Sequence, residues 1–231
     1  MPTGLFGKLP SQGDFVTRRL PWEFTSVWDA WLQAGIARAR ADLGDAWNTT
    51  YLTAPLWRFQ LAAGVVGANP WIGIWFASVD RVGRQFPLAI VETMPSGWAG
   101  RYAVIEHDEA FFSVEDVALQ GLDPRLGFDA FDRSIEALGL EQAARQASVL
   151  APQEIVLEPA ELSLEHFGAR TLRLAADVDA HTALAAAQSA GPATSSCFFT
   201  WGNEHHPPML LRLDGLPGET EFHGFLDGRW S

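Results

Sequence analysis

The chain has 231 residues, and 48% of them are hydrophobic, so it is long enough to bury a core without disulfides or a structural metal. Its net charge of −12 argues against nonspecific binding to nucleic acid or to anionic membranes, because a basic surface supplies that affinity. One cysteine, no secretory leader and no apolar run of about 18 residues together predict a soluble cytoplasmic protein without membrane insertion.

The first part of the chain predicts a strand, a loop and a long helix. Glycines and prolines in "GLFGKLPSQGDFV", which starts at Gly4, indicate a short strand that runs into a turn-rich loop. Apolar residues recur at three- and four-residue spacing across residues 20–44, as they do on one face of an amphipathic helix. Pro21 suits the first turn of this helix, and Gly44 suits its end.

Three strands are predicted next, in the segments "LWRFQLAAGVVG", "PWIGIWFASVD" and "FPLAIVETM". Only a few residues separate the second segment from the third. The intervening "DRVGRQ" is therefore expected to close an antiparallel hairpin.

The rest of the chain alternates between helical and strand patterns. We expect helices over residues 109–122, 130–138, 177–191 and 219–230, and a strand pair over residues 194–202 and 208–217. Residues 152–174 give no clear pattern, apart from an alternation in "RTLRLA". Helices interspersed with paired strands predict an α/β fold, a three-layer α/β/α sandwich with a mixed, largely antiparallel sheet in a single domain over residues 1–231.

The hairpin segment brings Asp80, Arg81 and Arg84 together around Gly83, which permits a positive φ. In one interpretation, the two guanidinium groups and nearby backbone N–H groups hold a phosphate or carboxylate. In the other, Asp80 accepts hydrogen bonds from an arginine or from turn amides, and the bend is fixed. An anion site needs both arginines unpaired and pointing the same way, and the structural interpretation is favoured.

Other chemistry receives little support. "GKLPSQGDF" lacks the spacing of a phosphate-binding P-loop, so Lys8 and Asp14 are expected to form a local ion pair or loop hydrogen bonds. Cys197 lies in an apolar run without a neighbouring base, so we expect it to be buried and unreactive. The adjacent His205 and His206 would point to opposite faces of a strand and converge poorly on a metal.

The remaining acidic groups fit a structural interpretation as well. The cluster at residues 107–109 is typical of a helix start, and neither Asp227 nor the pair Glu219 and Glu221 has a spacing that indicates acid–base catalysis. We expect no catalytic residue, no metal and no cofactor. Ten tryptophans exceed what one core needs, so some of them are expected at an interface.

The blocks "GLFGKLPSQGDFV", "RRLP", "WDAWLQ", "YLTAPLWRF" and "SVDRVGRQFPL" together resemble the type VI secretion-associated family TagF, also called ImpM. They cover about residues 4–92, and "SCFFTWG", "GLP" and "LDGRW" extend the resemblance over nearly the whole chain, including its carboxyl-terminal part at about 100–231. The two blocks that contain "GKLPSQGDF" and "SVDRVGRQFPL" are the specific ones.

The resemblance implies a cytoplasmic, non-enzymatic protein of a Gram-negative bacterium that represses type VI secretion assembly after translation. It implies binding to the forkhead-associated scaffold protein of that system. Some relatives carry a fused PP2C-type phosphatase module, and we expect none here. The family supplies no catalytic residues. It marks as motif positions Gly7, Lys8, Gly13, Asp14, Ser78, Asp80, Arg81, Gly83 and Arg84.

We expect Lys8, Asp14, Asp80, Arg81 and Arg84 to form one polar cluster that fixes the amino-terminal loop against the sheet. With exposed tryptophans, this cluster is expected to shape part of a partner-binding surface. Two rival functions stay open: a hydrolase that uses the arginines as an anion clamp, and a structural accessory subunit of the secretion apparatus. Whether the protein forms a homodimer also stays open.

Overall fold

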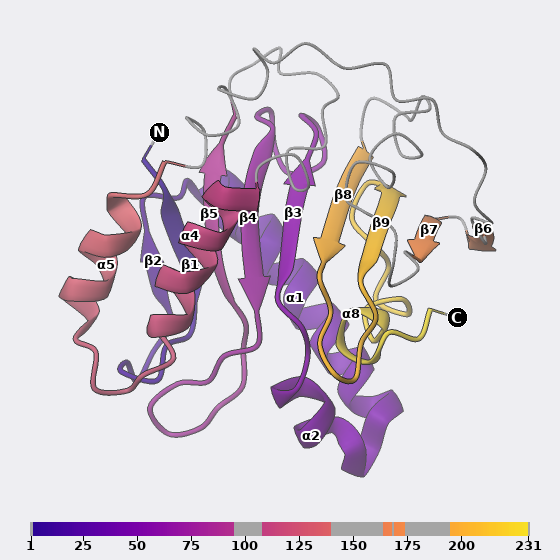
Figure 1. Ribbon diagram of the computed structural model, residues 1–231, viewed down its shortest axis with the longest axis horizontal. Helices are drawn as coiled ribbons and strands as arrows, with labels where there is room; N and C mark the ends of the chain where they lie inside the picture. The colour runs from indigo at the N-terminus through magenta and orange to yellow at the C-terminus, as the bar shows by residue number, and fades with distance from the viewer. Residues whose placement is uncertain (1, 95–107, 140–163, 168, 174–194, 231) are drawn as a thin grey trace.

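The computed structural model describes residues 2–94, 108–139, 164–167, 169–173 and 195–230 (Figure 1). Its strands are β1 (Gly4–Gly7), β2 (Val16–Arg18), β3 (Trp57–Leu61), β4 (Trp71–Phe76), β5 (Leu88–Thr93), β6 (Leu164–Phe167), β7 (Ala169–Arg173), β8 (Ser195–Thr200) and β9 (Met209–Asp214). Its helices are α1 (Trp22–Leu43), η1 (Gly44–Ala46), α2 (Trp47–Leu52), α4 (Asp108–Gln120), α5 (Phe128–Glu136) and α8 (Gly224–Asp227).

The described strands form one sheet in the order β2-β1-β5-β4-β3-β8-β9-β7-β6. Every pair of neighbours in this sheet is antiparallel, so the prediction of a mixed sheet is wrong for the described strands. The reason lies in the long crossover through α1 and α2. This crossover joins β2 to β3, which run in the same direction, but β1, β5 and β4 lie between them, so they never become parallel neighbours.

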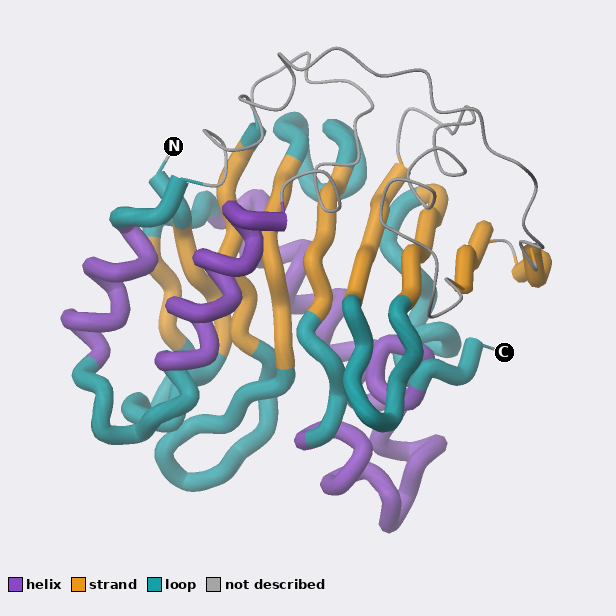
Figure 2. The backbone as a smooth tube through the Cα atoms, in the orientation of Figure 1, coloured by secondary structure: helices purple, strands orange, loops and turns teal. Residues whose placement is uncertain are grey.

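The sheet separates two apolar cores. Successive side chains of a strand point to opposite faces, so Ile72 and Ile74 of β4 enter one core while Trp71 and Trp75 enter the other. The first core receives from α4 and α5 the side chains of Phe111, Val114, Ala118, Phe131 and Ile135. The second core receives from α1 the side chains of Phe24, Trp28, Trp31, Leu32 and Ala39. Figures 1 and 2 show α4 and α5 in front of the sheet and α1 behind it. The three-layer sandwich and the single domain stay predictions for the chain as a whole.

Several predicted elements are confirmed. Helix α1 begins after Pro21 and ends at Gly44, whose φ of 51° suits glycine. Strands β4 and β5 form the predicted hairpin, with Phe76 opposite Leu88, and β8 pairs with β9. The helix expected over residues 219–230 is shorter, because only α8 within it is helical. The helix expected over residues 177–191 lies outside the described residues.

Four connections meet at one edge of the sheet. Strands β1, β4 and β8 run in the same direction, and β3 runs opposite to β4 and β8. The ends of β1, β4 and β8 and the start of β3 therefore share an edge, at the bottom of Figure 1. We call this edge the loop edge. It comprises the amino-terminal loop (residues 8–15), the α2 segment (47–56), the hairpin loop (77–87) and the β8–β9 turn (201–208).

Candidate interaction surface

The carboxylate of Asp80 lies at the centre of the hairpin loop. Its side chain is fully buried, and its two oxygens accept hydrogen bonds from different partners. Oδ1 accepts from the backbone N–H groups of Val82 (3.0 Å) and Arg84 (2.8 Å). Oδ2 accepts from Arg84 Nε (2.6 Å) and from Lys8 Nζ (3.1 Å). The bend is therefore closed around one negative charge.

Electrostatics holds this carboxylate ionised. Burial by itself raises the pKa of Asp80, because it removes the charged form from water. The backbone hydrogen bond from Arg84, the side chains of Lys8 and Arg84 and the backbone of Val82 outweigh that effect and place the pKa well below its ordinary value. The ammonium group of Lys8 also lies 5.2 Å from the centre of the Phe15 ring, which adds a cation–π contact.

The hairpin loop holds the amino-terminal loop at several points. The Ser78 hydroxyl donates to the Lys8 carbonyl at 2.8 Å, and the Arg81 N–H donates to the Gln12 carbonyl at 2.8 Å. Arg84 Nη2 donates to the Gly13 carbonyl. These bonds join segments that are about 70 residues apart in the sequence, so the motif residues bring two loops into one rigid unit.

Two motif glycines have conformational reasons to be glycine. Gly83 has a φ of 84°, and its N–H donates to the Asp80 carbonyl at 2.9 Å, which closes the bend. Gly7 has a φ of 140°, and a Cβ there would lie 2.0 Å from the Pro87 carbonyl oxygen. Asp14, by contrast, is fully exposed, and its carboxylate lies 3.9 Å from Arg84 Nη2. Asp14 therefore lies at the rim of the cluster, where a solvent-exposed ion pair contributes little to the stability of the fold.

Helix α2, which the sequence did not predict, supports the hairpin loop from the other side. The Tyr51 hydroxyl donates to the Ser78 carbonyl (2.9 Å) and accepts from the Ser78 N–H (3.1 Å). The side-chain Oε1 of Gln85 accepts from Trp47 Nε1 at 2.5 Å, and Gln85 Nε2 donates to Asn48 Oδ1 at 2.8 Å. Burial raises the pKa of Tyr51, so this hydroxyl stays protonated.

The arrangement does not meet the requirement for an anion clamp. Arg84 is engaged by Asp80 and by the Gly13 carbonyl, so it is not free to bind an external anion. The Arg81 guanidinium is exposed, and among the described residues it has no ion-pair partner. One exposed arginine beside a neutralised cluster resembles the rim of an interface more than a substrate site.

The described tryptophans divide between core and surface, and their predicted role at an interface stays a prediction. Those buried in the second core are Trp28, Trp31, Trp47, Trp57, Trp71 and Trp75. Trp22 is 82% exposed at the start of α1, and Trp201 is 41% exposed in the β8–β9 turn. Trp98 lies outside the described residues. The loop edge collects four of the exposed large apolar side chains, which are Phe15, Leu52, Val82 and Trp201.

The adjacent histidines occupy the β8–β9 turn and not a strand, which corrects that part of the prediction. His205 is exposed, whereas His206 is 4% exposed and its Nε2–H donates to the Leu226 carbonyl at 2.6 Å. Burial lowers the pKa of His206, with the Leu226 bond and Asp227 opposing that shift. Among the described residues, no group of three or more histidine, cysteine, aspartate or glutamate side chains could hold a metal ion.

Cys197 is buried in β8, and burial raises the pKa of its thiol, so the thiolate that a nucleophile needs is disfavoured. Asp227 and Glu221 bond to backbone N–H groups, those of Arg229 (2.9 Å) and Gly218 (3.0 Å). His107 lies outside the described residues. No helix in the described part of the chain is long and apolar enough to cross a membrane.

Sequence reasoning missed a buried ion pair behind the loop edge. Arg58 of β3 is 1% exposed and binds Glu115 of α4 through Nε (2.6 Å) and Nη2 (3.3 Å). Its guanidinium lies 4.8 Å from the centre of the Phe111 ring. The sequence does contain a signal for this pair, which is the single arginine inside the apolar strand pattern "LWRFQL". An arginine that is buried in a strand is expected to have an acidic partner.

Comparison with known proteins identifies a family and a similar solved structure. The model of the TagF N-terminal domain, described as type VI secretion system-associated, matches residues 4–138. The crystal structure of PA0076 from Pseudomonas aeruginosa PAO1 is 34% identical, covers 99% of this chain and 96% of its own, and superposes with a TM-score of 0.73. No curated protein matches the sequence.

Proposed function

Because the chain belongs to the type VI secretion-associated TagF family, we propose that it is a cytoplasmic, non-enzymatic repressor of type VI secretion assembly. It acts by binding the forkhead-associated scaffold protein of that system. The observation that carries the proposal is the construction of the loop edge. Motif residues there use their polar groups to fix loops against each other, with apolar side chains left at the surface.

A rigid edge suits binding because little conformational entropy is lost on association. The exposed side chains of Phe15 and Val82 flank the closed bend around Asp80, and Arg81 lies beside them. Apolar groups with an arginine at their rim are typical of protein–protein interfaces. Repression then needs no chemistry: the bound protein occupies a surface of the scaffold that assembly requires.

The two rival functions have less support. A hydrolase that uses an arginine clamp needs Arg84 free, and Arg84 is bound to Asp80 at 2.6 Å. A structural accessory subunit differs from a repressor in stoichiometry, because it co-purifies with the assembled machine in a fixed ratio. Substoichiometric scaffold binding favours the repressor.

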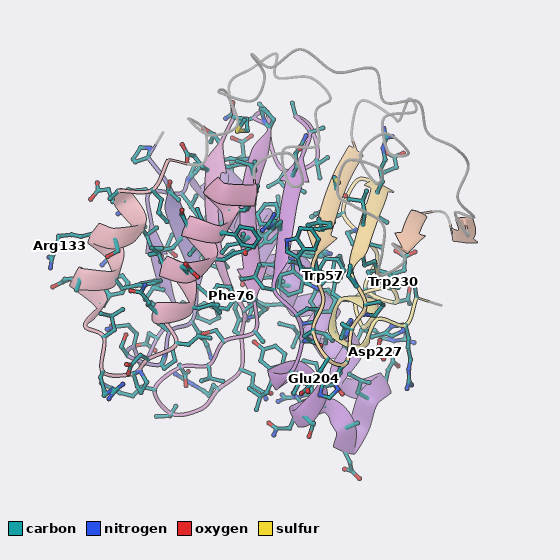
Figure 3. All side chains as sticks on the ribbon, in the orientation of Figure 1. Trp57, Phe76, Arg133, Glu204, Asp227 and Trp230 are labelled. Carbon is teal, nitrogen blue, oxygen red and sulfur yellow. The ribbon has the colours of Figure 1, made fainter. Side chains whose placement is uncertain are left out.

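Arg81 offers a sharper test than Arg84, because its side chain contributes no ion pair within the described part of the fold. We expect Arg81→Glu to weaken pull-down of the purified scaffold protein about tenfold while the Tm stays within about 1 °C of wild type. Arg133→Glu on α5, which is labelled in Figure 3 and also exposed, is the matched control and binds like wild type. Absence of scaffold binding by the wild-type chain contradicts the proposal.

The cellular test measures assembly itself. Cells that lack the protein assemble more secretion apparatus than cells that carry it. Wild type and Arg133→Glu restore repression, whereas Arg81→Glu restores it poorly. Equal assembly with and without the protein overturns the repressor function.

A further inference from the structure

The β8–β9 turn holds an exposed tryptophan on a frame that is fixed by hydrogen bonds. The Thr200 hydroxyl donates to the Leu56 carbonyl at 2.7 Å and accepts from the Gly202 N–H at 3.0 Å. Asn203 Oδ1 accepts from the N–H groups of His205 (2.8 Å) and His206 (3.0 Å). Asn203 Nδ2 donates to the Thr53 carbonyl at 2.8 Å, which ties the turn to the α2 segment.

Trp201 is fixed by its surroundings yet remains open to solvent. Its ring packs edge to face against Phe199, with ring centres 4.9 Å apart, and 41% of the residue stays exposed. A Cβ at Gly202 would lie 2.1 Å from the His206 carbonyl oxygen, so no residue with a side chain fits at this position beside the ring. A large aromatic surface on a rigid backbone is suited to serve as a binding anchor.

This ring forms one wall of a pocket of about 490 Å³. The pocket is lined by Trp201, Asn203, Glu204, His205, His206, Pro207 and Pro208. His206 is more than nine-tenths buried, and its Nδ1 has no hydrogen-bond partner among the described residues. The lining thus combines an indole ring, two proline rings and two imidazoles with the polar side chains of Asn203 and Glu204.

Glu204 gives the pocket its charge. Its side chain is 85% exposed, and its described ion-pair partner is His205 Nε2 at 3.3 Å, which is positively charged only when it is protonated. Figure 3 shows Glu204 at the loop edge, near α2. This carboxylate belongs to a chain with a net charge of −12. An anionic ligand is repelled here and a cationic one is attracted.

An aromatic face, apolar proline walls and one carboxylate match the two parts of an arginine or lysine side chain. The methylene groups lie along the prolines, and the cation binds both the indole face and the carboxylate. We propose that this pocket receives a basic side chain, presented on an extended segment of the partner protein. The inference rests on the proposed function for the partner's identity, but its chemistry is testable without that partner.

The first test uses two blocked peptides, acetyl-Pro-Arg-Pro-amide and acetyl-Pro-Glu-Pro-amide, titrated into the full ¹⁵N-labelled chain. We expect the arginine peptide to shift the Trp201 indole resonance and the backbone amides of residues 202–206 with a Kd of about 1 mM. The glutamate peptide gives no shifts. Absence of shifts at about 10 mM arginine peptide, or equal shifts with both peptides, overturns the inference.

Two substitutions and their controls sharpen this test. Glu204→Gln weakens the arginine peptide about fivefold at low salt, and Trp201→Ala abolishes its effect on residues 202–206. Glu136→Gln removes an exposed carboxylate from α5, and Trp22→Ala removes the most exposed described tryptophan; both bind the peptide like wild type. Equal binding by Glu204→Gln and wild type contradicts the role of the carboxylate.

The second test uses the scaffold protein and separates the two proposals. Trp201→Ala weakens scaffold binding about thirtyfold, whereas the control Trp22→Ala leaves it unchanged. Glu204→Lys weakens scaffold binding more than Glu204→Gln does, because it reverses the charge. If wild type binds the scaffold and Trp201→Ala binds equally well, the pocket inference fails and the proposed function stands. If wild type does not bind the scaffold, the proposed function fails, and the peptide titration still decides the inference.

Discussion

At the hairpin loop, the buried carboxylate of Asp80 has four hydrogen-bond donors, two from backbone N–H groups and two from the side chains of Lys8 and Arg84. At the β8–β9 turn of the same edge, the buried ring of His206 has one partner, the Leu226 carbonyl, and its Nδ1 has none among the described residues. One region carries a buried charge that is fully compensated. The other keeps a buried ring neutral.

This difference separates what holds the loop edge together from what remains available for binding. Ion pairs and backbone bonds at the hairpin loop are satisfied inside the protein, so changing them affects folding first. At the turn, 41% of Trp201 and 85% of the Glu204 side chain are exposed, so we expect both residues to contribute less to the fold. The substitutions below test that division through stability.

The largest expected effect comes from Asp80→Ala. Removing the carboxylate leaves the ammonium group of Lys8, whose side chain is only 9% exposed, without its described ion-pair partner. It also frees two backbone N–H groups. We expect the Tm to fall by about 10 °C in thermal unfolding. The exposed Asp14→Ala is the matched control and shifts the Tm by less than about 1 °C. Equal shifts for both variants would refute the assignment of Asp80 as the centre of the loop.

Tyr51→Phe is next in size. The Tyr51 hydroxyl bonds both backbone groups of the buried Ser78. Phenylalanine leaves the Ser78 N–H without its described partner, whereas the Ser78 carbonyl keeps the hydrogen bond from the Phe86 N–H at 3.1 Å. We expect the free energy of unfolding to fall by about 2 kcal/mol in urea denaturation. Thr49→Ala in the same helix, at an exposed position, should cost less than about 0.5 kcal/mol. A loss in Tyr51→Phe no larger than in this control contradicts the bridging role of the hydroxyl.

Sequence patterns predicted the local parts of this edge well. Apolar spacing fixed the position of α1, and the short gap between two strand patterns predicted the β4–β5 hairpin and the bend around Gly83. These features depend on residues that are close in the sequence. The motif blocks around Lys8 and Asp80 were also correctly expected to lie near each other.

The missed features depend on contacts between distant segments. Strand β2 has only three residues and exists because Val16 and its neighbours pair with β1. Tyr51 meets Ser78 only after α1 has crossed behind the sheet, and Arg58 meets Glu115 only after α4 has folded over the other face. No local pattern encodes such pairs. The environment of His206 was not predicted either, because its partner, the Leu226 carbonyl, comes from a segment 20 residues further along the chain.

The third prediction concerns pH and the β8–β9 turn. Burial lowers the pKa of His206 in the folded state, so the unfolded chain binds the proton more readily. The stability from this residue is present above its unfolded pKa, which is about 6.5, and it is lost as the pH falls through the lower folded pKa. Chemical denaturation at several pH values measures the free energy of unfolding. We expect this free energy to fall less between pH 8 and pH 5 in His206→Gln than in wild type. The exposed His205→Gln is the control and should keep the wild-type pH dependence of the free energy of unfolding. If His206→Gln also keeps it, burial of His206 does not cause that pH dependence.

The smallest expected effect on stability is that of Trp201→Ala, although this residue is a large aromatic. The residue is 41% exposed, and its ring packs against one aromatic neighbour among the described residues, Phe199, so truncation should lower the free energy of unfolding by about 1 kcal/mol. The fully buried Trp57, which donates to the Phe225 carbonyl at 2.9 Å, should cost about 4 kcal/mol when replaced by alanine. Urea denaturation of both variants measures this contrast. If Trp201→Ala lowers the free energy of unfolding nearly as much as Trp57→Ala does, the turn is a structural element like the hairpin loop. The exposed indole of Trp201 is then needed for folding, which contradicts its assignment as a surface kept for a partner.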